Sequence, residues 1–276
     1  MGVFRYTRQS FVREVLFIAI ALAFCVPWYI LLTLSLKTNT QVYFSPLSLP
    51  TKGYFRNYSI AWNQSGLGGS MLNSFIITVA SVAGLIVVGS LGGYAIARRE
   101  SKLASGLYFL FVLGIILPFQ LAILPTFFIF RHLHLTGGLL GMILLHIGLT
   151  TPLSVFLYTG FVRALPREYE EAAQVDGAGF LRTYLRVVFP LLSPVTGTVA
   201  VLSSVVIWND FFVSLIFLFG STTQTLPLAL YSFVSEDVSQ YNLIMAAVAI
   251  TIVPILAFYI FAQRQLIRGF AGGIRG

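Results

Sequence analysis

The chain has 276 residues, of which 57% are hydrophobic and 9% are charged, and its formal net charge is +8. Soluble domains carry roughly 25% charged residues, so this composition excludes an ordinary soluble protein and favours one that resides in a lipid bilayer. Nucleic-acid binding would need a clustered basic face, and the 17 basic residues are spread along the chain instead, so we expect no nucleic-acid partner.

A helix needs about 20 apolar residues to cross about 30 Å of hydrocarbon. Six largely uncharged segments reach this length. We therefore expect an all-α integral membrane protein with six transmembrane helices, forming a single membrane domain over residues 1–276. The predicted spans cover approximately residues 15–36, 71–97, 106–130, 139–162, 191–219 and 242–263.

The first span is longer than the 7–15 apolar residues of a typical signal peptide, and no A-x-A-like cleavage site follows it. We therefore expect it to be retained as a helix. It contains Cys25, the only cysteine, so no disulfide can form within the chain. A lone cysteine in an apolar segment is expected to behave as a small buried residue.

The second span contains Gly89 and Gly93, a G-x-x-x-G pair that lets two helix backbones approach closely. The partner helix can belong to the same chain or to another subunit, and the sequence leaves both open. The stretch 89–92 (GSLG) superficially suggests an intramembrane serine protease with Ser90 as nucleophile and His146 as base. No G-x-S-x-G motif supports that alternative.

The third span contains Pro118 and Pro125, and each proline lacks the N–H that an α-helix needs. We expect the helix to kink or unwind there. His132 and His134 follow in the short loop 131–138, and His146 falls in the fourth span. No Cys, Asp or Glu lies near them in sequence, so we expect no metal site.

Residues 163–190 interrupt the apolar pattern, since 168–190 carries four of the nine acidic residues and two of the basic ones. Pro166 suits a helix start, three glutamates follow near the positive end of the helix dipole, and Gly177 suits a C′ position. We expect a second helix from Phe180, with Pro190 opening the next span. The residues alone leave two interpretations, an anchoring interfacial helix or a docking element for a cytoplasmic partner.

The fifth span contains Trp208, Asn209 and Asp210, and Asp210 is the only carboxylate expected deep inside a span. Ionisable groups are costly in a membrane and usually face a cavity or a partner. On consecutive helical positions these three side chains would spread around the helix and could not all face one lumen. Two roles remain open for Asp210, a contact in a translocation pathway or a bond to a neighbouring helix.

The distribution of Lys and Arg predicts the topology. With both termini in the cytoplasm, the cytoplasmic segments hold 13 basic residues and the external ones hold four. Residues 163–190 then lie in the cytoplasm, and the polar loops 37–70 and 220–241 lie outside.

The cytoplasmic segment resembles the EAA loop of permease subunits in binding-protein-dependent ABC importers. The family motif is E-A-A, three residues, Gly, nine residues and I-x-L-P. It appears here as Glu171-Ala172-Ala173, Gly177 and Val187-x-Phe189-Pro190. The triplet Asp176-Gly177-Ala178 is typical of the sugar-importing branch. Further likenesses run along the chain, at Asn57-Tyr58, Trp62, Asn73-Ser74, Pro118, Gln120, Pro125, Trp208-Asn209-Asp210 and the basic, glycine-rich end 268–276.

The resemblance implies a type I ABC importer permease fold, close to the maltose-transporter-type subunit, in the bacterial cytoplasmic (inner) membrane. It implies a non-catalytic sugar-translocating subunit that contacts a separate ATPase through the EAA loop. The partners implied are a second permease subunit, two ATPase subunits, an external solute-binding protein and a sugar. The implied coupling residues are Glu170, Glu171, Ala172, Ala173, Asp176, Gly177 and Ala178, and the candidate pathway residues are Trp208, Asn209 and Asp210.

No phosphate-binding G-x-x-x-x-G-K-[ST] loop is present, so ATP and Mg²⁺ are expected on the partner ATPase and no cofactor in this chain. The substrate is not readable from these residues. A polyol phosphate such as glycerol phosphate stays open as an alternative cargo, and an intramembrane enzyme is a remote one.

Overall fold

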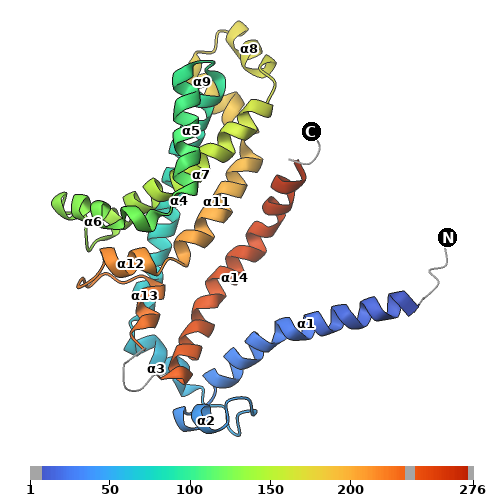
Figure 1. The fold of residues 1–276 in the computed structure, drawn as a ribbon, viewed down its shortest axis with the longest axis vertical. Helices are drawn as coiled ribbons and strands as arrows, with labels where there is room; N and C mark the ends of the chain where they lie inside the picture. The colour runs from blue at the N-terminus through green and yellow to red at the C-terminus, as the bar shows by residue number, and fades with distance from the viewer. Residues whose placement is uncertain (1–7, 234–239, 273–276) are drawn as a thin grey trace. The chain divides into compact units, whose positions relative to one another are not determined.

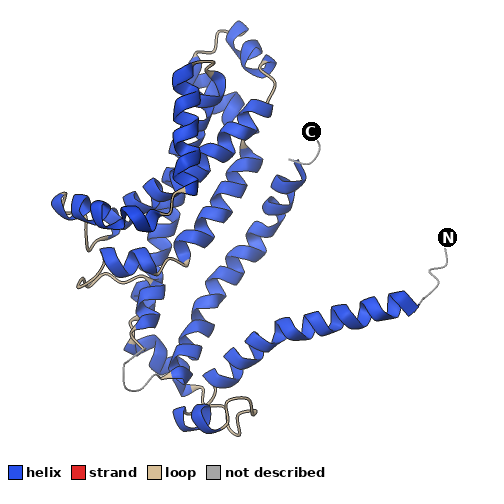
Figure 2. Ribbon diagram, viewed as in Figure 1, coloured by secondary structure: helices blue, strands red, loops and turns tan. Residues whose placement is uncertain are grey.

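The computed structural model describes residues 8–233 and 240–272, and every regular element in these ranges is a helix (Figure 2). The longer helices are α1 (Arg8–Ser35), α4 (Leu67–Arg98), α5 (Lys102–Ile116), α6 (Ile123–His132), α7 (Leu139–Ala164), α11 (Ser193–Trp208) and α14 (Tyr241–Gly272). The shorter ones are α2 (Asn39–Phe44), α3 (Arg56–Gln64), η1 (Phe119–Ala122), α8 (Glu168–Val175), α9 (Phe180–Thr183), η2 (Tyr184–Val188), α10 (Phe189–Leu191), α12 (Phe212–Phe217) and α13 (Leu226–Tyr231).

The helices form two compact units, residues 1–67 with 229–253 and residues 68–228 with 254–276. In the first unit, the buried Asn57 of α3 ties three segments together. Its Nδ2 donates to the carbonyl oxygens of Ser35 at 2.8 Å and Lys37 at 2.7 Å, and its Oδ1 accepts from Asn242 at 3.1 Å. One amide therefore holds the end of α1, α3 and the start of α14 in register.

The side chain of Lys37 is enclosed by its own loop in the first unit and is only 1% exposed. Its ammonium donates to the carbonyl oxygens of Ser45 at 2.6 Å and Pro46 at 2.9 Å, and to the hydroxyl of Ser48 at 3.3 Å. These oxygens replace the water molecules that would solvate an exposed ammonium group. Lys37 therefore fixes the conformation of the loop that follows α1.

From Val15 onward helix α1 carries no charged residue, and little of it is buried within the protein. Cys25 is exposed on it, so the expectation of a buried cysteine is wrong for the isolated chain. A helix of this composition can face lipid on every side, so a bilayer takes the place of a protein core around it.

Among its described residues, the second unit contains two apolar clusters. The first lies where α4, α7 and the break after α11 meet, and its buried members are Ile77, Val82, Leu85, Ile123, Met142, Leu145, Ile207, Val213, Phe217 and Leu218. The second lies beneath α8 and α9, and its buried members are Tyr94, Tyr158, Val162, Tyr184, Val188, Leu192, Val195 and Val199. In Figure 1, α8 and α12 lie toward opposite ends of this unit.

Helices α4 and α7 pack closely through the predicted glycine pair. A Cβ on Gly89 would collide with the side chain of Ser154, and one on Gly93 would lie 2.6 Å from Tyr158 Cβ and 3.0 Å from the backbone nitrogen of Thr159. The interpretation of this G-x-x-x-G pair as packing within the chain is confirmed.

Two of the predicted spans are broken. Helix α5 ends before Leu117 and Pro118, which are extended, and the segment Phe119–His132 leaves at 96° to it. The expected interruption at Pro118 is confirmed. Pro125 causes none, because it lies in the first turn of α6, where no helical partner for its nitrogen is lost.

The second break follows Leu191, and the two parts are bent by 72°. The next helix begins at Ser193, so the expectation that Pro190 opens the span is wrong. Pro190 instead lies inside the helical segment Phe180–Leu191, directly after the π-helical turn Tyr184–Val188. Pro194 takes the early position in α11 that suits a proline.

Within the described residues, three helices, in α1, α4 and α7, are each long and apolar enough to span a membrane, and each bent pair adds one more if it counts as a single span. The apolar stretch Tyr241–Ala257 in α14 is shorter. The predicted spans 15–36, 71–97, 106–130, 139–162 and 242–263 fall on these helices or on the first bent pair. The predicted span 191–219 covers α11 but runs past its end at Trp208 and into α12, and the number of spans stays a prediction.

Candidate functional site

The predicted coupling segment forms the short helix α8, which ends as the sequence predicts. Gly177 has φ +77°, the left-handed conformation that favours glycine. The N–H of Gly177 donates to the carbonyl oxygen of Gln174 at 2.9 Å, and that of Ala178 to the carbonyl oxygen of Ala173 at 2.9 Å. These two bonds define a Schellman motif, so the assignment of Gly177 to the C′ position is confirmed.

Most of the predicted coupling residues are open to solvent. Glu171, Ala172, Asp176 and Gly177 are exposed, and Ala173 and Ala178 are half-buried. No Cβ-sized obstacle lies near Gly177. Alanines here leave a smooth surface, and the carboxylates lie beside it, so the outer face of α8 is available to another protein.

Glu170 is the exception, because it is the only buried residue of α8. Its Oε1 accepts a hydrogen bond from Nε of Arg98 at 2.7 Å and forms an ion pair with Nη2 of the same guanidinium at 2.7 Å, and its Oε2 accepts from the hydroxyl of Tyr94 at 2.7 Å. Nη2 of Arg98 also donates to the carbonyl oxygen of Leu165 at 3.1 Å. Both oxygens of Glu170 are thus engaged inside the protein. We refer to Glu170, Arg98 and Tyr94 together as the α4–α8 clasp.

Tyr94 also connects the clasp to the helix that follows Gly177. Its ring centroid lies 5.7 Å from that of Phe180 and 5.4 Å from that of Tyr184. The hydroxyl of Tyr184 lies 2.6 Å from Ser90 Oγ. The end of α4 therefore contacts both helices of the predicted helix–turn–helix. Sequence reasoning missed Tyr94 and Arg98, because neither forms part of a motif and each lies more than seventy positions from Glu170.

Asp210 lies at a helix break, and the expectation that it occupies a helical position in mid-span is wrong. Helix α11 ends at Trp208, and α12 begins at Phe212. The carboxylate of Asp210 accepts from the N–H groups of Val213 at 3.2 Å and Ser214 at 2.9 Å, and from the Ser214 hydroxyl at 3.0 Å. The free N–H groups at the start of α12 and the half-buried carboxylate satisfy each other here, so Asp210 caps α12.

His146 of α7 approaches the same carboxylate. Its Nε2 lies 3.8 Å from Asp210 Oδ2, and the histidine is 3% exposed. This separation exceeds a hydrogen bond, so the contact is electrostatic only while the imidazole is protonated. Of the two roles left open for Asp210, the contact with a neighbouring helix has the direct structural support. Sequence reasoning missed His146 as its neighbour, because the two residues belong to different spans.

Trp208 and Asn209 do not join Asp210 in one cluster. Trp208 lines a cavity of about 150 Å³ whose wall is mostly apolar, together with Phe75, Thr78, Val79, Ser204, Val205, Pro254 and Ile255. Asn209 is exposed, and its Nδ2 donates to the carbonyl oxygen of Val205 in its own helix at 2.8 Å. The structure thus separates the three predicted pathway residues.

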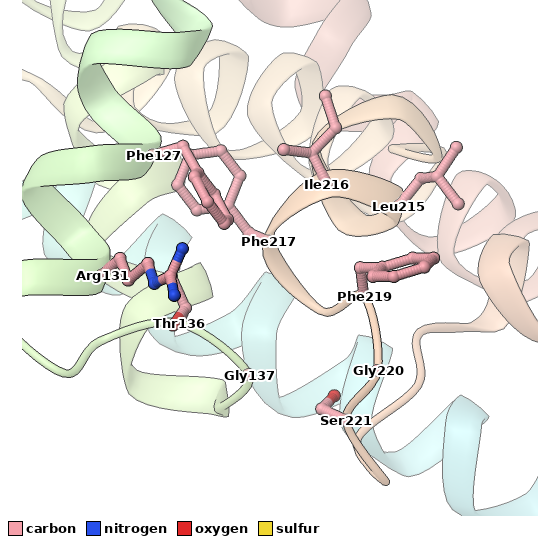
Figure 3. A pocket seen from close by; sticks show the side chains of 10 residues that line it. All are labelled: Phe127, Arg131, Thr136, Gly137, Leu215, Ile216, Phe217, Phe219, Gly220 and Ser221. Carbon is pink, nitrogen blue, oxygen red and sulfur yellow. The ribbon is translucent and has the colours of Figure 1, made fainter.

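A larger cavity, of about 710 Å³, lies between the α6–α7 connection and the end of α12 (Figure 3). Its wall is apolar apart from Arg131 and two hydroxyl groups, and it includes none of the predicted site residues. The residues around it are Phe127, Arg131, Thr136, Gly137, Leu215, Ile216, Phe217, Phe219, Gly220 and Ser221.

The geometry does not support the intramembrane serine protease considered from the sequence. Ser90 Oγ contacts the hydroxyl of Tyr184 and the backbone of its own helix, whereas His146 lies beside Asp210. The serine–histidine pair of a protease is therefore not formed. No three His, Cys, Asp or Glu side chains converge within the described part of the chain. Glu236 and Asp237 of the loop 220–241, and the last residues of the basic end, 273–276, lie outside the described residues.

Comparisons with known proteins give a consistent picture. The family described as binding-protein-dependent transport system inner membrane component matches residues 86–272. The melibiose/raffinose/stachyose import permease protein of Bacillus subtilis is 36% identical over 276 residues, covering 98% of each chain. A probable permease protein for starch degradation products from Thermoanaerobacterium thermosulfurigenes is 34% identical over 266 residues, covering 96% of each.

The fold also matches a solved structure. A chain of a bacterial ABC transporter involved in the import of the acidic polysaccharide alginate superposes with a TM-score of 0.82 at 21% identity. The match covers 95% of this chain and 99% of that one. At this identity the likeness supports the fold, which agrees with the helical architecture expected from the sequence.

Proposed function

This chain belongs to the family of binding-protein-dependent transport system inner membrane components, and from that premise we propose that it is one of two permease subunits of an ATP-driven sugar importer. The family assignment makes it a multi-pass inner-membrane protein and a transport subunit. The proposed cargo is a mono-, di- or oligosaccharide, because full-length relatives are named for the import of melibiose, raffinose and stachyose, starch degradation products and diacetylchitobiose.

The observation that carries the coupling part of this proposal is the exposed outer face of α8. Glu171, Ala172 and Asp176 present a smooth, acidic surface that ends in a fixed glycine turn. We propose that it fits a cleft on an ATPase subunit, which holds the ATP and Mg²⁺. A second permease, two ATPase subunits and an external binding protein complete the proposed assembly.

Within this chain, Trp208 is the candidate that best suits a translocation pathway, because it lines a cavity. An aromatic face is a common surface for the apolar side of a sugar ring. Asn209 is exposed and adds an amide that can bond to hydroxyl groups. Asp210 shapes the pathway indirectly, by fixing the break between α11 and α12.

Transport itself provides the first test. A tagged copy of this chain is purified with its co-expressed partners and reconstituted in liposomes with the binding protein. Uptake of melibiose, raffinose, stachyose, diacetylchitobiose and glycerol 3-phosphate is then measured with and without ATP. We expect ATP-dependent uptake of at least one of the sugars. Uptake of glycerol 3-phosphate alone would replace the sugar assignment with the polyol phosphate alternative, and uptake without ATP would reject an ABC importer.

Replacement of Gly177 tests the coupling segment. Gly177→Val forces a β-branched residue into a left-handed backbone, at a cost of about 1–2 kcal/mol, enough to shift the geometry of the α8 end. We expect co-purification of the ATPase and uptake to fall about ten-fold, while Gly177→Asn keeps both within about two-fold.

Gly179→Ala is the matched control for this replacement. Gly179 is exposed two residues further on, has φ −71° and has no neighbour that an added Cβ would meet. This variant should transport normally. Normal assembly and uptake in Gly177→Val would refute the coupling role of the turn.

A further inference from the structure

The buried face of α8 holds a carboxylate where an amphipathic surface helix would ordinarily hold an apolar side chain. Apolar contacts tolerate sliding, because dispersion forces have little directionality. Hydrogen bonds between charged groups fix distance and angle together. Glu170 accepts two such bonds, from Nε of Arg98 and the hydroxyl of Tyr94, both at 2.7 Å, and Nη2 of Arg98 forms an ion pair with it at 2.7 Å. The polar clasp therefore sets the position of α8 against the end of α4 in every direction.

The residues that receive Glu170 are themselves held firmly. Arg98 donates a hydrogen bond to the carbonyl oxygen of Leu165, the C-cap residue of α7. Tyr94 is 5% exposed and belongs to the apolar cluster beneath α8, where it packs against Tyr184. Gly93, directly before Tyr94, brings α4 into close contact with the backbone of α7. The clasp thus ends on a closely packed helix pair that runs through the second unit.

From this geometry we infer that the α4–α8 clasp is the rigid link through which movement of α8 enters the membrane helices. Glu170 is a positioning residue in this link: it faces inward, while the neighbouring Glu171 faces the partner. Helix α4 receives the displacement, and α7 moves with it because their backbones touch at Gly93. This inference rests on the proposed function, since it assumes that an ATPase displaces α8.

The chain contains a matched comparison for this idea. Arg167, which precedes α8, pairs with Glu100 in the loop after α4, and this ion pair has the same length of 2.7 Å. Its side chains are 52% and 83% exposed, whereas those of Arg98 and Glu170 are 14% and 11% exposed. Water screens the outer pair and leaves it free to rearrange, so only the inner one can transmit a displacement.

The experiment compares Glu170→Gln with Glu100→Gln in the reconstituted complex with its binding protein. Three quantities are measured: co-purification of the ATPase subunits, ATP hydrolysis, and sugar uptake per ATP hydrolysed. We expect Glu170→Gln to keep the ATPase subunits and basal hydrolysis but to lower uptake per ATP at least about ten-fold. Glu100→Gln should keep all three within about two-fold of the unmodified complex.

Each outcome then decides the matter. Unchanged coupling in Glu170→Gln overturns the inference, and so does loss of the ATPase subunits, since that would make Glu170 a docking residue. Equal loss in both variants also overturns it. If Glu170→Gln fails to accumulate in the membrane, Tyr94→Phe decides, because it removes one clasp bond and keeps the ring. Reduced uptake per ATP with intact assembly is expected for Tyr94→Phe, and unchanged uptake per ATP overturns the inference.

The same data separate this inference from the proposed function. If the unmodified complex imports none of the sugars, the proposed function fails whatever the variants do. If the unmodified complex imports sugar and Glu170→Gln is fully coupled, only the clasp fails.

Discussion

Asp210 shows how the local bonds of a single residue can hold a helix break in place. Its carboxylate accepts two backbone N–H groups and one hydroxyl at the start of α12, in a region where water is scarce. Removal would leave these donors without partners, which is costly away from water. The residue looks like a pathway carboxylate in the sequence, yet its local bonds describe a helix cap.

We predict that Asp210→Ala lowers the stability of the purified complex by about 0.5–2 kcal/mol, the cost of losing an N-cap. Asp210→Asn keeps one acceptor oxygen, so its stability should lie between that of the unmodified complex and that of Asp210→Ala. Thermal unfolding in detergent measures the change, and Asn209→Ala is the control, because Asn209 is exposed and bonds only to its own helix. Lost uptake with unaltered unfolding in Asp210→Asn would instead favour a direct role in the pathway.

Residue roles differ in how far the sequence reveals them. The position of Gly177 is predictable, since a glycine after a short charged helix is the common mark of a left-handed cap. Glu170 is not, because Glu168, Glu170 and Glu171 are chemically alike and only their angular positions separate them. The glutamate that faces inward is the one that can reach Tyr94 and Arg98. These two residues belong to α4, and the local sequence pattern of α8 contains no information about them.

At the scale of elements, the interface between α4 and α7 depends on the absence of side chains. Gly93 lies where Tyr158 and the backbone of Thr159 leave no room for a Cβ, and the nearest obstacle is partly main chain, which cannot swing away. Hydroxyl groups complete the contact, as Ser154 Oγ donates to the carbonyl oxygen of Leu85 at 3.3 Å. The interface combines close backbone approach with polar bonds, the usual basis of helix association in lipid.

We predict that Gly93→Ala destabilises the protein by about 1–3 kcal/mol, the typical cost of overpacking a tight contact. Gly160→Ala is the control, because Gly160 is exposed in α7 and an added Cβ there meets nothing within 4 Å. Thermal unfolding of both variants in the same detergent provides the comparison. Equal melting temperatures for the two would show that α4 and α7 can separate without loss.

The helices themselves follow from apolar runs, whereas their breaks follow from local chemistry. Pro118 marks one break, because it is extended and separates α5 from the 3-10 turn Phe119–Ala122. Pro190 and Pro194 bracket the other, yet the bend occurs between them. The π-helical turn Tyr184–Val188 shifts the register before Pro190, and no composition rule predicts such a turn.

At the scale of the whole molecule, charge and hydropathy predict a multi-pass membrane protein, and the EAA-like spacing predicts the family to which the chain belongs. Fold and class were thus readable from the sequence. The clasp and the neighbourhood of Asp210 were not, because each joins residues from separate spans. The predicted sidedness, with 13 basic residues inside and four outside, stays a prediction.

We predict that α8 lies on the cytoplasmic side of the membrane and α2 on the external side. In a Cys25→Ala background, Phe44→Cys should react with a membrane-impermeant maleimide added to intact cells, because Phe44 is 84% exposed. Val175→Cys, at a residue that is 88% exposed, should react only after the membrane is opened. The reverse pattern would invert the topology and remove α8 from the reach of a cytoplasmic ATPase.

The enclosure of Lys37 has a practical consequence for surface chemistry. Its nitrogen donates to two carbonyl oxygens and a hydroxyl and is enclosed, so it is not accessible to attack an acylating reagent. The other two lysines are exposed: Lys52 lies in a loop predicted to be outside, and Lys102 is the first residue of α5, at the predicted cytoplasmic side. Amine-directed dyes or cross-linkers would therefore address a single lysine on each side.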